Sequence, residues 1–123
     1  MESKEDKCVF HPYGRDLLAP TIKQAALETV TRDFLKDCAV HIAVSSSIQV
    51  GDLVGPSMYV EGAGLFFSTD IQVTHQHTLY GITWQLPFFN IVADSGARVS
   101  LWYTVKKSDE DDLSSPLGLY TVK

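Results

Sequence analysis

The histidines are the residues of this chain whose type and spacing could hold a metal ion. His75 and His77 stand two residues apart in a run that alternates like a β-strand, and His41 lies in a second such run. Residues i and i+2 of a strand share a face, so both imidazoles could bind one ion, with His41 as a third ligand. The next carboxylate after His77 is Asp94, and no cysteine completes the set. We therefore expect no metal and no other cofactor, with a His-liganded metalloenzyme as an alternative.

Catalytic motifs are the next candidates for chemistry. The chain has no Gly-x-Ser-x-Gly nucleophile turn, and Gly62-Ala63-Gly64 lacks the later glycine and the following helix of a phosphate-binding loop. The carboxylates of residues 109–112 are consecutive, unlike a positioned acid–base pair. These observations predict a protein that is not an enzyme.

Aromatic side chains on polar surfaces are the best interaction candidates. Trp102 alternates with inward residues and shares its side with polar ones, and Tyr59 stands between Ser57 and Glu61. Amphipathic rings on a wet face suit glycan stacking, contact with lipid headgroups or a protein interface. The candidate ligand-binding residues are Tyr59, Trp84, Pro87, Phe88 and Trp102.

The elements that must position these residues centre on 78–105. Tyr80, Ile82, Trp84 and Leu86 alternate with more polar residues, and Val99, Leu101, Tyr103 and Val105 do the same after the turn at Asp94-Ser95-Gly96. Period-two alternation is typical of half-buried strands. We expect these two strands to form an antiparallel hairpin or meander, with the final LGLYTVK as a strand beside it.

An amphipathic helix is expected at about 21–37. Thr21 and Gln24 have capping-box spacing, and Ile22, Val30 and Phe34 belong to an i+4 apolar track. Further short strands are expected around residues 40–44, 58–60 and 71–77, and Leu65-Phe66-Phe67 reads as a run buried on both sides. The pattern predicts a mainly β fold: an antiparallel β-sandwich with one N-terminal amphipathic helix packed on it.

Length and composition predict a single domain over 1–123, with 1–12 as a disordered lead-in and 108–116 as a flexible acidic connector. The net charge is −5 and the basic residues are scattered, which argues against nucleic acid as a partner. No window is apolar enough to span a bilayer and no signal peptide is evident, so a soluble product of unknown location is expected. Cys8 and Cys38 match no metal or redox spacing; a disulfide and two free thiols, with Cys38 buried, both stay open.

The order of features resembles the actinoporin-like fold of sea-anemone cytolysins and fungal fruit-body lectins. The resemblance lies in Cys38-Ala39-Val40-His41-Ile42 after the expected helix, in Trp84 to Asn90, and in Gly96 to Val105. It implies that Pro87 and Phe88 occupy a headgroup-binding loop, with Tyr59 near the same rim. Gln85 replaces the family's serine, and the aromatic cluster that seats phosphocholine is absent after Asn90.

These observations together predict a non-enzymatic binding module, lectin-like or cytolysin-like, that recognises a lipid headgroup or a glycan at a membrane or cell surface. The alternative is a structural assembly subunit of the viral or phage coat or tail type, in which Tyr59 and Trp102 would be subunit contacts. A homo-oligomer is compatible with both functions.

Overall fold

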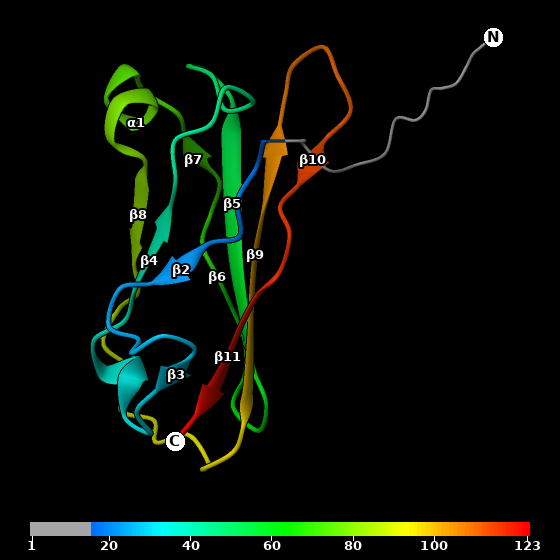
Figure 1. Ribbon diagram of the computed structural model, residues 1–123. Coiled ribbons are helices and arrows are strands. Elements are labelled where there is room, and N and C mark those ends of the chain that lie inside the picture. Colours follow the sequence, from blue (N-terminus) through cyan, green and yellow to red (C-terminus); the bar gives the residue numbers. More distant parts are fainter. Residues whose placement is uncertain (1–15) are drawn as a thin grey trace, which may run out of the picture.

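The computed structural model describes residues 16–123, which form two β-sheets (Figure 1). The larger sheet has the order β3-β11-β9-β5-β6, with β10 also paired to β9 and β7 to β5, and the smaller has the order β2-β4-β8. The chain is thus mainly β, as predicted. The elements are β2 (Thr21–Ile22), β3 (Thr29–Val30), the 3₁₀ turn η1 (Phe34–Lys36), β4 (Ala39–Ile42), β5 (Leu53–Val60), β6 (Gly64–Phe67), β7 (Ile71–Gln72), α1 (His75–Tyr80), β8 (Ile82–Gln85), β9 (Arg98–Lys106), β10 (Leu113–Ser114) and β11 (Gly118–Val122).

The centre of the larger sheet is the antiparallel pair β5–β9, in register from Leu53↔Lys106 to Val60↔Val99. The predicted alternation on β9 is confirmed, because its inward side chains are fully buried; these are Val99, Leu101, Tyr103 and Val105. The final strand also lies where the sequence predicts it: β11 pairs antiparallel with β9 through Gly118↔Leu101 and Tyr120↔Val99.

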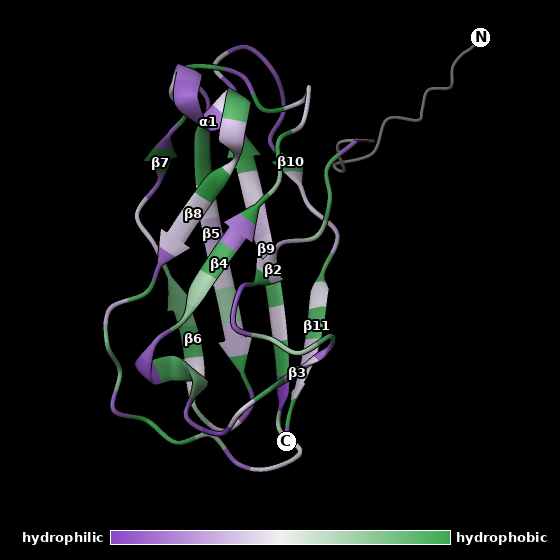
Figure 2. Cartoon of the chain, turned by 60° about the vertical axis from the view of Figure 1, so that its left-hand side comes forward, coloured by the Kyte–Doolittle hydropathy of each residue, from purple (hydrophilic) through white to green (hydrophobic). Residues whose placement is uncertain are grey.

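Strands β8 and β9 do not form the expected hairpin. β8 pairs with β4 in the smaller sheet, from Ala39↔Gln85 to Ile42↔Ile82, whereas β9 lies in the larger sheet. Figure 2 shows β4 and β8 in front of β5 and β9. The segment between β8 and β9 therefore crosses from one sheet to the other instead of reversing within one.

The hydrophobic core lies between the two sheets. One buried cluster joins Val40 and Trp84 of the smaller sheet to Met58 and Leu101 of the larger one. A second cluster joins Ile42 and Ile82 to residues of β5 and β9, among them Val54, Tyr103 and Val105. Alternate residues from both sheets thus bury each other's apolar faces.

The prediction of a helix at 21–37 is wrong. The segment contains β2, β3 and η1 instead, and Leu27 is 95% exposed with a φ of +57°. Gln24 does not cap a helix, because its Oε1 accepts the backbone N–H of Ala39 at 3.0 Å. β-Branched residues at Thr29 and Val30 pair in parallel with β11, so tertiary strand pairing outweighs a local apolar period.

The strand expected through His75 and His77 is also wrong, because these residues begin helix α1. Thr74 is its N-cap: the Thr74 hydroxyl accepts the N–H of His77, and His77 Nδ1 accepts the N–H of Thr74 at 3.0 Å. This reciprocal pair satisfies two N–H groups that a helix end leaves without partners. Tyr80, expected to point inward, lies on this helix and is 76% exposed.

The segment that leads into β2 is tied to the sheets by buried tyrosines. Tyr103 Oη donates to the carbonyl of Leu18 at 2.8 Å, and Tyr120 Oη accepts the N–H of Ile22 at 3.0 Å. Burial raises the pKa of Tyr103 to about 12, so its phenol stays protonated. The expected lead-in of residues 1–12 lies outside the described residues. Within the expected acidic connector, Leu113–Ser114 pair with β9.

Asp16 carries a pH-dependent contribution to stability. Its carboxylate accepts hydrogen bonds from the hydroxyls of Ser46, Ser47 and Ser45, and these hold the Asp16 pKa well below its ordinary value of 3.8. A depressed folded-state pKa gives stability that is present above 3.8 and is lost as the pH falls toward the folded-state pKa. We expect Asp16→Asn to lower the melting temperature at pH 7, with a difference from wild type that shrinks between about pH 5 and about pH 2. A difference that does not change with pH in thermal melts would contradict this prediction.

Candidate functional site

The structure divides the predicted site residues between two surfaces. Trp84 and Pro87 line an apolar groove, and Phe88 lies next to Pro87 with 68% of its surface exposed. Tyr59 and Trp102 lie instead on the outer face of the larger sheet, on β5 and β9. The five predicted residues therefore do not form one site.

The groove runs between an edge strand of each sheet. β6 ends the path of the larger sheet and β8 ends the smaller one, and side chains of both line the same cavity. Its volume is about 330 Å³, which is within the range of small-ligand sites. The residues that line it have largely apolar side chains, with the indole N–H of Trp84 as the one polar side-chain group: Leu65, Phe66, Phe67, Trp84, Leu86, Pro87 and Phe89.

Aromatic packing shapes the inner wall of the groove. The rings of Phe66 and Phe89 meet edge to face, with centroids 5.0 Å apart and an angle of 64° between their planes. This is a favourable arrangement of aromatic quadrupoles, and both rings also pack against the main core cluster. Trp84 is 8% exposed, so it contributes a largely buried wall and not a protruding ring.

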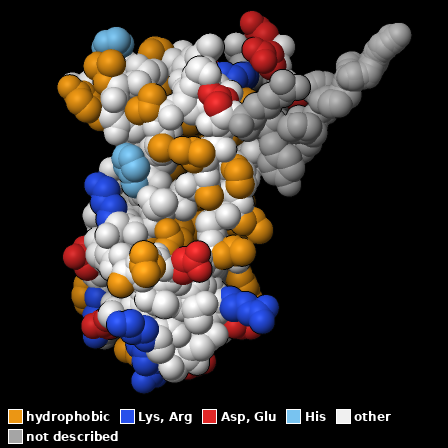
Figure 3. Space-filling model, in the orientation of Figure 1, with side chains coloured by type: hydrophobic (Ala, Val, Ile, Leu, Met, Phe, Trp, Pro, Cys, Tyr) orange, Lys and Arg blue, Asp and Glu red, His pale blue; other side chains and the backbone are white. Residues whose placement is uncertain are grey.

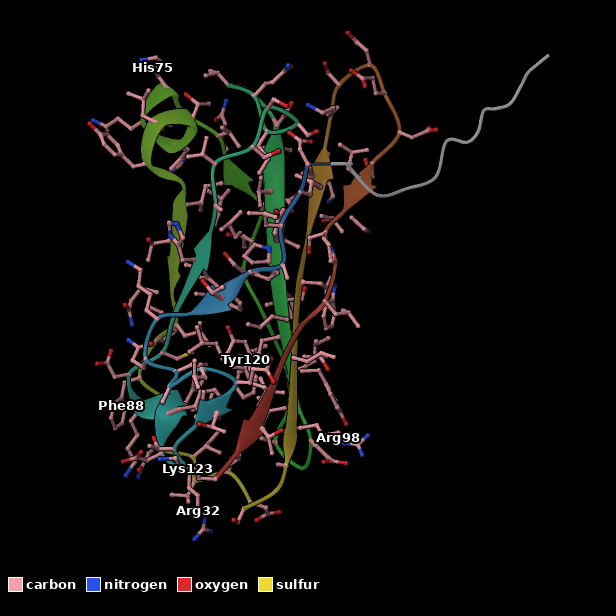
Figure 4. The ribbon with its side chains drawn as sticks, viewed as in Figure 1. Arg32, His75, Phe88, Arg98, Tyr120 and Lys123 are labelled. Carbon is pink, nitrogen blue, oxygen red and sulfur yellow. The ribbon has the colours of Figure 1, made fainter. Side chains whose placement is uncertain are left out.

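Backbone hydrogen bonds hold the groove-forming loop after β8 in place. The N–H groups of Leu86, Phe89 and Ala93 donate to the carbonyls of Cys38, Leu35 and Arg32, at 3.0, 3.1 and 2.7 Å. Arg32 Nε donates in return to the Ala93 carbonyl at 2.9 Å. The loop is thus fastened along segment 32–38, and its backbone conformation is fixed before any ligand arrives. Phe88 points away from the body of the molecule, at the opposite end from His75 (Figure 4).

The residues of β6 are functional candidates that sequence reasoning misplaced. The run Leu65-Phe66-Phe67, expected to be buried on both sides, leaves Leu65 54% and Phe67 70% exposed. The reason is the strand alternation: Leu65 and Phe67 lie opposite Tyr59 and Ser57 on the outer face of the sheet, whereas Phe66 lies opposite the buried Met58. Three consecutive large apolar residues directly after a Gly-Ala-Gly turn are the signal that could have marked this edge.

The outer face of the larger sheet forms a second apolar surface, which we call the outer-sheet patch. The cross-strand register places Leu65, Tyr59, Ser100 and Leu119 in one row. The adjacent row contains Phe67, Ser57 and Trp102. Residues opposite one another across strands share a face, so the large side chains of the patch are Tyr59, Leu65, Phe67, Trp102 and Leu119.

The histidines do not come together. His41 lies on β4, whereas His75 and His77 lie on α1, and i and i+2 of a helix point to different sides. Within residues 16–123 no group of three or more His, Cys, Asp or Glu side chains is placed to hold a metal ion. Nδ1 of His41 is buried without a hydrogen-bond partner, and the His41 ring lies against Gly81.

Cys38 is fully buried, which agrees with the alternative of two free thiols. Desolvation raises the pKa of its thiol to about 12, which keeps it protonated and unreactive at neutral pH. Cys8 lies outside the described residues, so the disulfide question stays open.

No family model, characterised protein or solved structure matches this chain. The resemblance to actinoporin-like cytolysins and fruit-body lectins therefore stays a prediction. In the part of the chain that the structure describes, no helix is both long and apolar enough to cross a bilayer.

Proposed function

We propose that this chain is a mainly antiparallel β-sandwich domain that binds a lipid at a membrane or cell surface and catalyses no reaction. The observation that carries the proposal is the apolar groove, in which two of the predicted ligand-binding residues, Trp84 and Pro87, meet the aromatic residues of β6 and of the loop after β8.

The lining of the groove favours a lipid over a glycan. Sugar hydroxyls lose their hydrogen bonds to water on binding and need polar partners in the site. The lining side chains offer one hydrogen-bonding group, the indole N–H of Trp84, so the groove provides such hydroxyls with few side-chain partners. An acyl chain or another apolar part of a lipid has no such requirement, and its burial is favourable at roughly 25 cal/mol per Å².

The rim of the groove suits contact with a membrane surface. Pro87 and Phe88 are both exposed. They lie between Leu86 and Phe89, whose backbone N–H groups donate to carbonyls of segment 32–38. An exposed aromatic ring on a fixed loop can enter the headgroup region without a large loss of conformational entropy. The chain carries a net charge of −5, so we infer that zwitterionic lipids bind better than anionic ones.

The test is co-sedimentation with vesicles. We expect wild-type protein to bind phosphatidylcholine vesicles, with less binding as phosphatidylserine is added. Phe88→Ser should weaken binding by about 10-fold, because one buried aromatic contributes roughly 1.5 kcal/mol or more. Tyr80→Ser is the matched control, because Tyr80 is 76% exposed but lies on α1, away from the groove. This variant should bind vesicles like wild type.

A fluorescence measurement locates the bound lipid. The chain has two tryptophans, so Trp102→Phe leaves Trp84 as the sole reporter in the groove wall. Vesicles or a single-chain phospholipid should shift Trp84 emission in this variant. The proposal fails if wild type binds no vesicle, if Phe88→Ser and Tyr80→Ser behave alike, or if soluble glycans and not lipids shift Trp84 emission.

A further inference from the structure

We infer that the outer-sheet patch is a self-association surface, through which two copies of this chain pack face to face. Leu65 and Phe67 belong to both the groove and the patch, whereas Tyr59, Trp102 and Leu119 do not line the groove. Variants of these three residues therefore test self-association separately from lipid binding.

The patch exposes much more apolar surface than its alternating strands require. Tyr59 is 47%, Leu65 54%, Phe67 70% and Leu119 62% exposed, and all lie on one face in two adjacent rows. Leu117, in the segment that leads into β11, adds a further side chain that is 57% exposed. Contiguous apolar surface of this kind is typical of an interaction site, whereas isolated exposed apolar residues are ordinary. Figure 3 shows apolar side chains down the right-hand side of the molecule, alongside the segment that leads into β11, with charged side chains above and below them.

The size of the face fits a weak dimer. The patch lies on β11, β9, β5 and β6, which have five, nine, eight and four residues. At about 3.3 Å per residue and about 4.8 Å per strand spacing, these strands cover roughly 410 Å² in projection, before the relief of their side chains is counted. Weak, transient protein interfaces bury less than about 600 Å² on each partner, which agrees with a dissociation constant in the micromolar range.

The relief of the patch suits a copy of itself. Along β5 and β9 large and small side chains alternate diagonally: Trp102 lies opposite Ser57, and Tyr59 lies opposite Ser100. A second copy can place its large side chains over the two serines, which gives close packing without a cavity.

The charges around the patch favour the same partner. Arg98 and Glu61 lie together at one end, where Glu61 Oε1 accepts the backbone N–H of Arg98 at 3.1 Å. Lys106 and Asp70 form an ion pair of 3.0 Å toward the other end. Both ends carry charges of both signs, with Asp112 also near Lys106, so two copies can pair unlike charges across the rim despite the net charge of −5. An apolar centre with a charged rim is the usual composition of an interface.

Sedimentation equilibrium tests the inference on the full chain. We expect wild type to form dimers at micromolar concentration, and Tyr59→Glu and Leu119→Glu each to raise the dimer dissociation constant by at least about 30-fold. Leu79→Glu is the matched control, because Leu79 is 55% exposed but lies on α1, outside the patch. This variant should dimerise like wild type. Far-UV circular dichroism verifies that each variant is folded.

Three results would overturn the inference. The first is a wild-type chain that stays monomeric at about 0.5 mM, well above a micromolar dissociation constant, which needs no variant to interpret. The second is a dimer that Tyr59→Glu and Leu119→Glu leave intact. The third is a monomer whose vesicle or glycan binding those two variants abolish, which would assign the patch to a different partner. Vesicle binding by Phe88→Ser is scored separately, so failure of the dimer and failure of lipid binding are distinguishable.

Discussion

Gly81→Ala is expected to destabilise the fold by about 4 kcal/mol, which is the range of severe point mutations. Gly81 follows α1 and precedes β8, with a φ of +84° and a ψ of −175°, a conformation that is essentially restricted to glycine. An added Cβ would lie 2.6 Å from the carbonyl oxygen of Ile42 and 2.8 Å from Cε1 of His41. The carbonyl belongs to β4, the partner of β8, so it cannot move without breaking the smaller sheet.

Gly51→Ala separates the cost of the positive φ from the cost of the steric contact. Gly51 also has a positive φ, of +95°, but an added Cβ there meets nothing within 4 Å. Its substitution should cost about 1.5 kcal/mol, from backbone strain alone. The measurement is urea unfolding followed by tryptophan fluorescence. His41→Ala in the Gly81→Ala background should recover little, because the carbonyl contact remains. Equal losses for Gly51→Ala and Gly81→Ala would contradict the close approach to Ile42.

Lys107→Ala is expected to lower the free energy of unfolding by about 3 kcal/mol, because it leaves a buried carboxylate without its partner. Lys107 Nζ lies 2.6 Å from Asp52 Oδ2, and the side chains are only 9% and 11% exposed. The same oxygen of Asp52 accepts the N–H of Gln49 at 2.9 Å, so the pair fastens the end of β9 to the turn before β5. Asp52→Asn combined with Lys107→Met should recover part of the loss, because neither buried charge then remains unpaired.

The neighbouring lysine is the control for this prediction. Lys106 pairs with Asp70 at 3.0 Å, but these side chains are 47% and 34% exposed. An exposed pair contributes little, so Lys106→Ala should lower the free energy of unfolding much less than Lys107→Ala does, and less still at high salt. Similar losses for the two lysine variants in urea unfolding would show that burial of the Asp52 pair does not decide its contribution.

Strand alternation predicted the inward residues correctly wherever a strand is long or lies between two neighbours. β9 is the strongest case, because the register that buries Val99 also buries Leu101, Tyr103 and Val105. Period-two patterning marks the buried face of a strand, but it carries no information about the partner strand. This is why Ile82–Gln85 could be recognised as a strand and still be paired with the wrong neighbour.

Apolar spacing misled where elements are very short. In segment 21–37, three residues of the expected apolar track, Ile22, Val30 and Phe34, do lie in the core. They reach it from two strands of two residues each and a 3₁₀ turn, which have no period to detect. Helix α1 is the opposite case. It has no buried residue, so no apolar period marks it, and it begins at the capping box of Thr74 and His77. The alternation of Ile71, Val73 and His75 with polar residues predicted a strand there instead.

The aromatic character of the candidate interaction surfaces could be predicted from the sequence, whereas their division into two surfaces could not. Tyr59 and Phe88 were singled out as ring-bearing surface residues, and both are exposed. Trp84 belongs to the groove through contact with residues of β6, far from it in sequence, and Phe66, Phe67 and Phe89 were missed. A groove arises from the meeting of two sheet edges, which depends on the tertiary structure.

By itself, then, the sequence determined that this chain is mainly β, which faces of its long strands are buried, and that aromatic side chains such as Tyr59 and Phe88 lie on its surface. The tertiary structure decided which strands pair, that β8 and β9 belong to different sheets, and that the rings form one groove and one flat patch. The physical reason is the range of the interactions involved. Side-chain alternation is imposed by backbone geometry within a few residues, whereas sheet pairing is selected by burial of surfaces that the chain brings together only on folding.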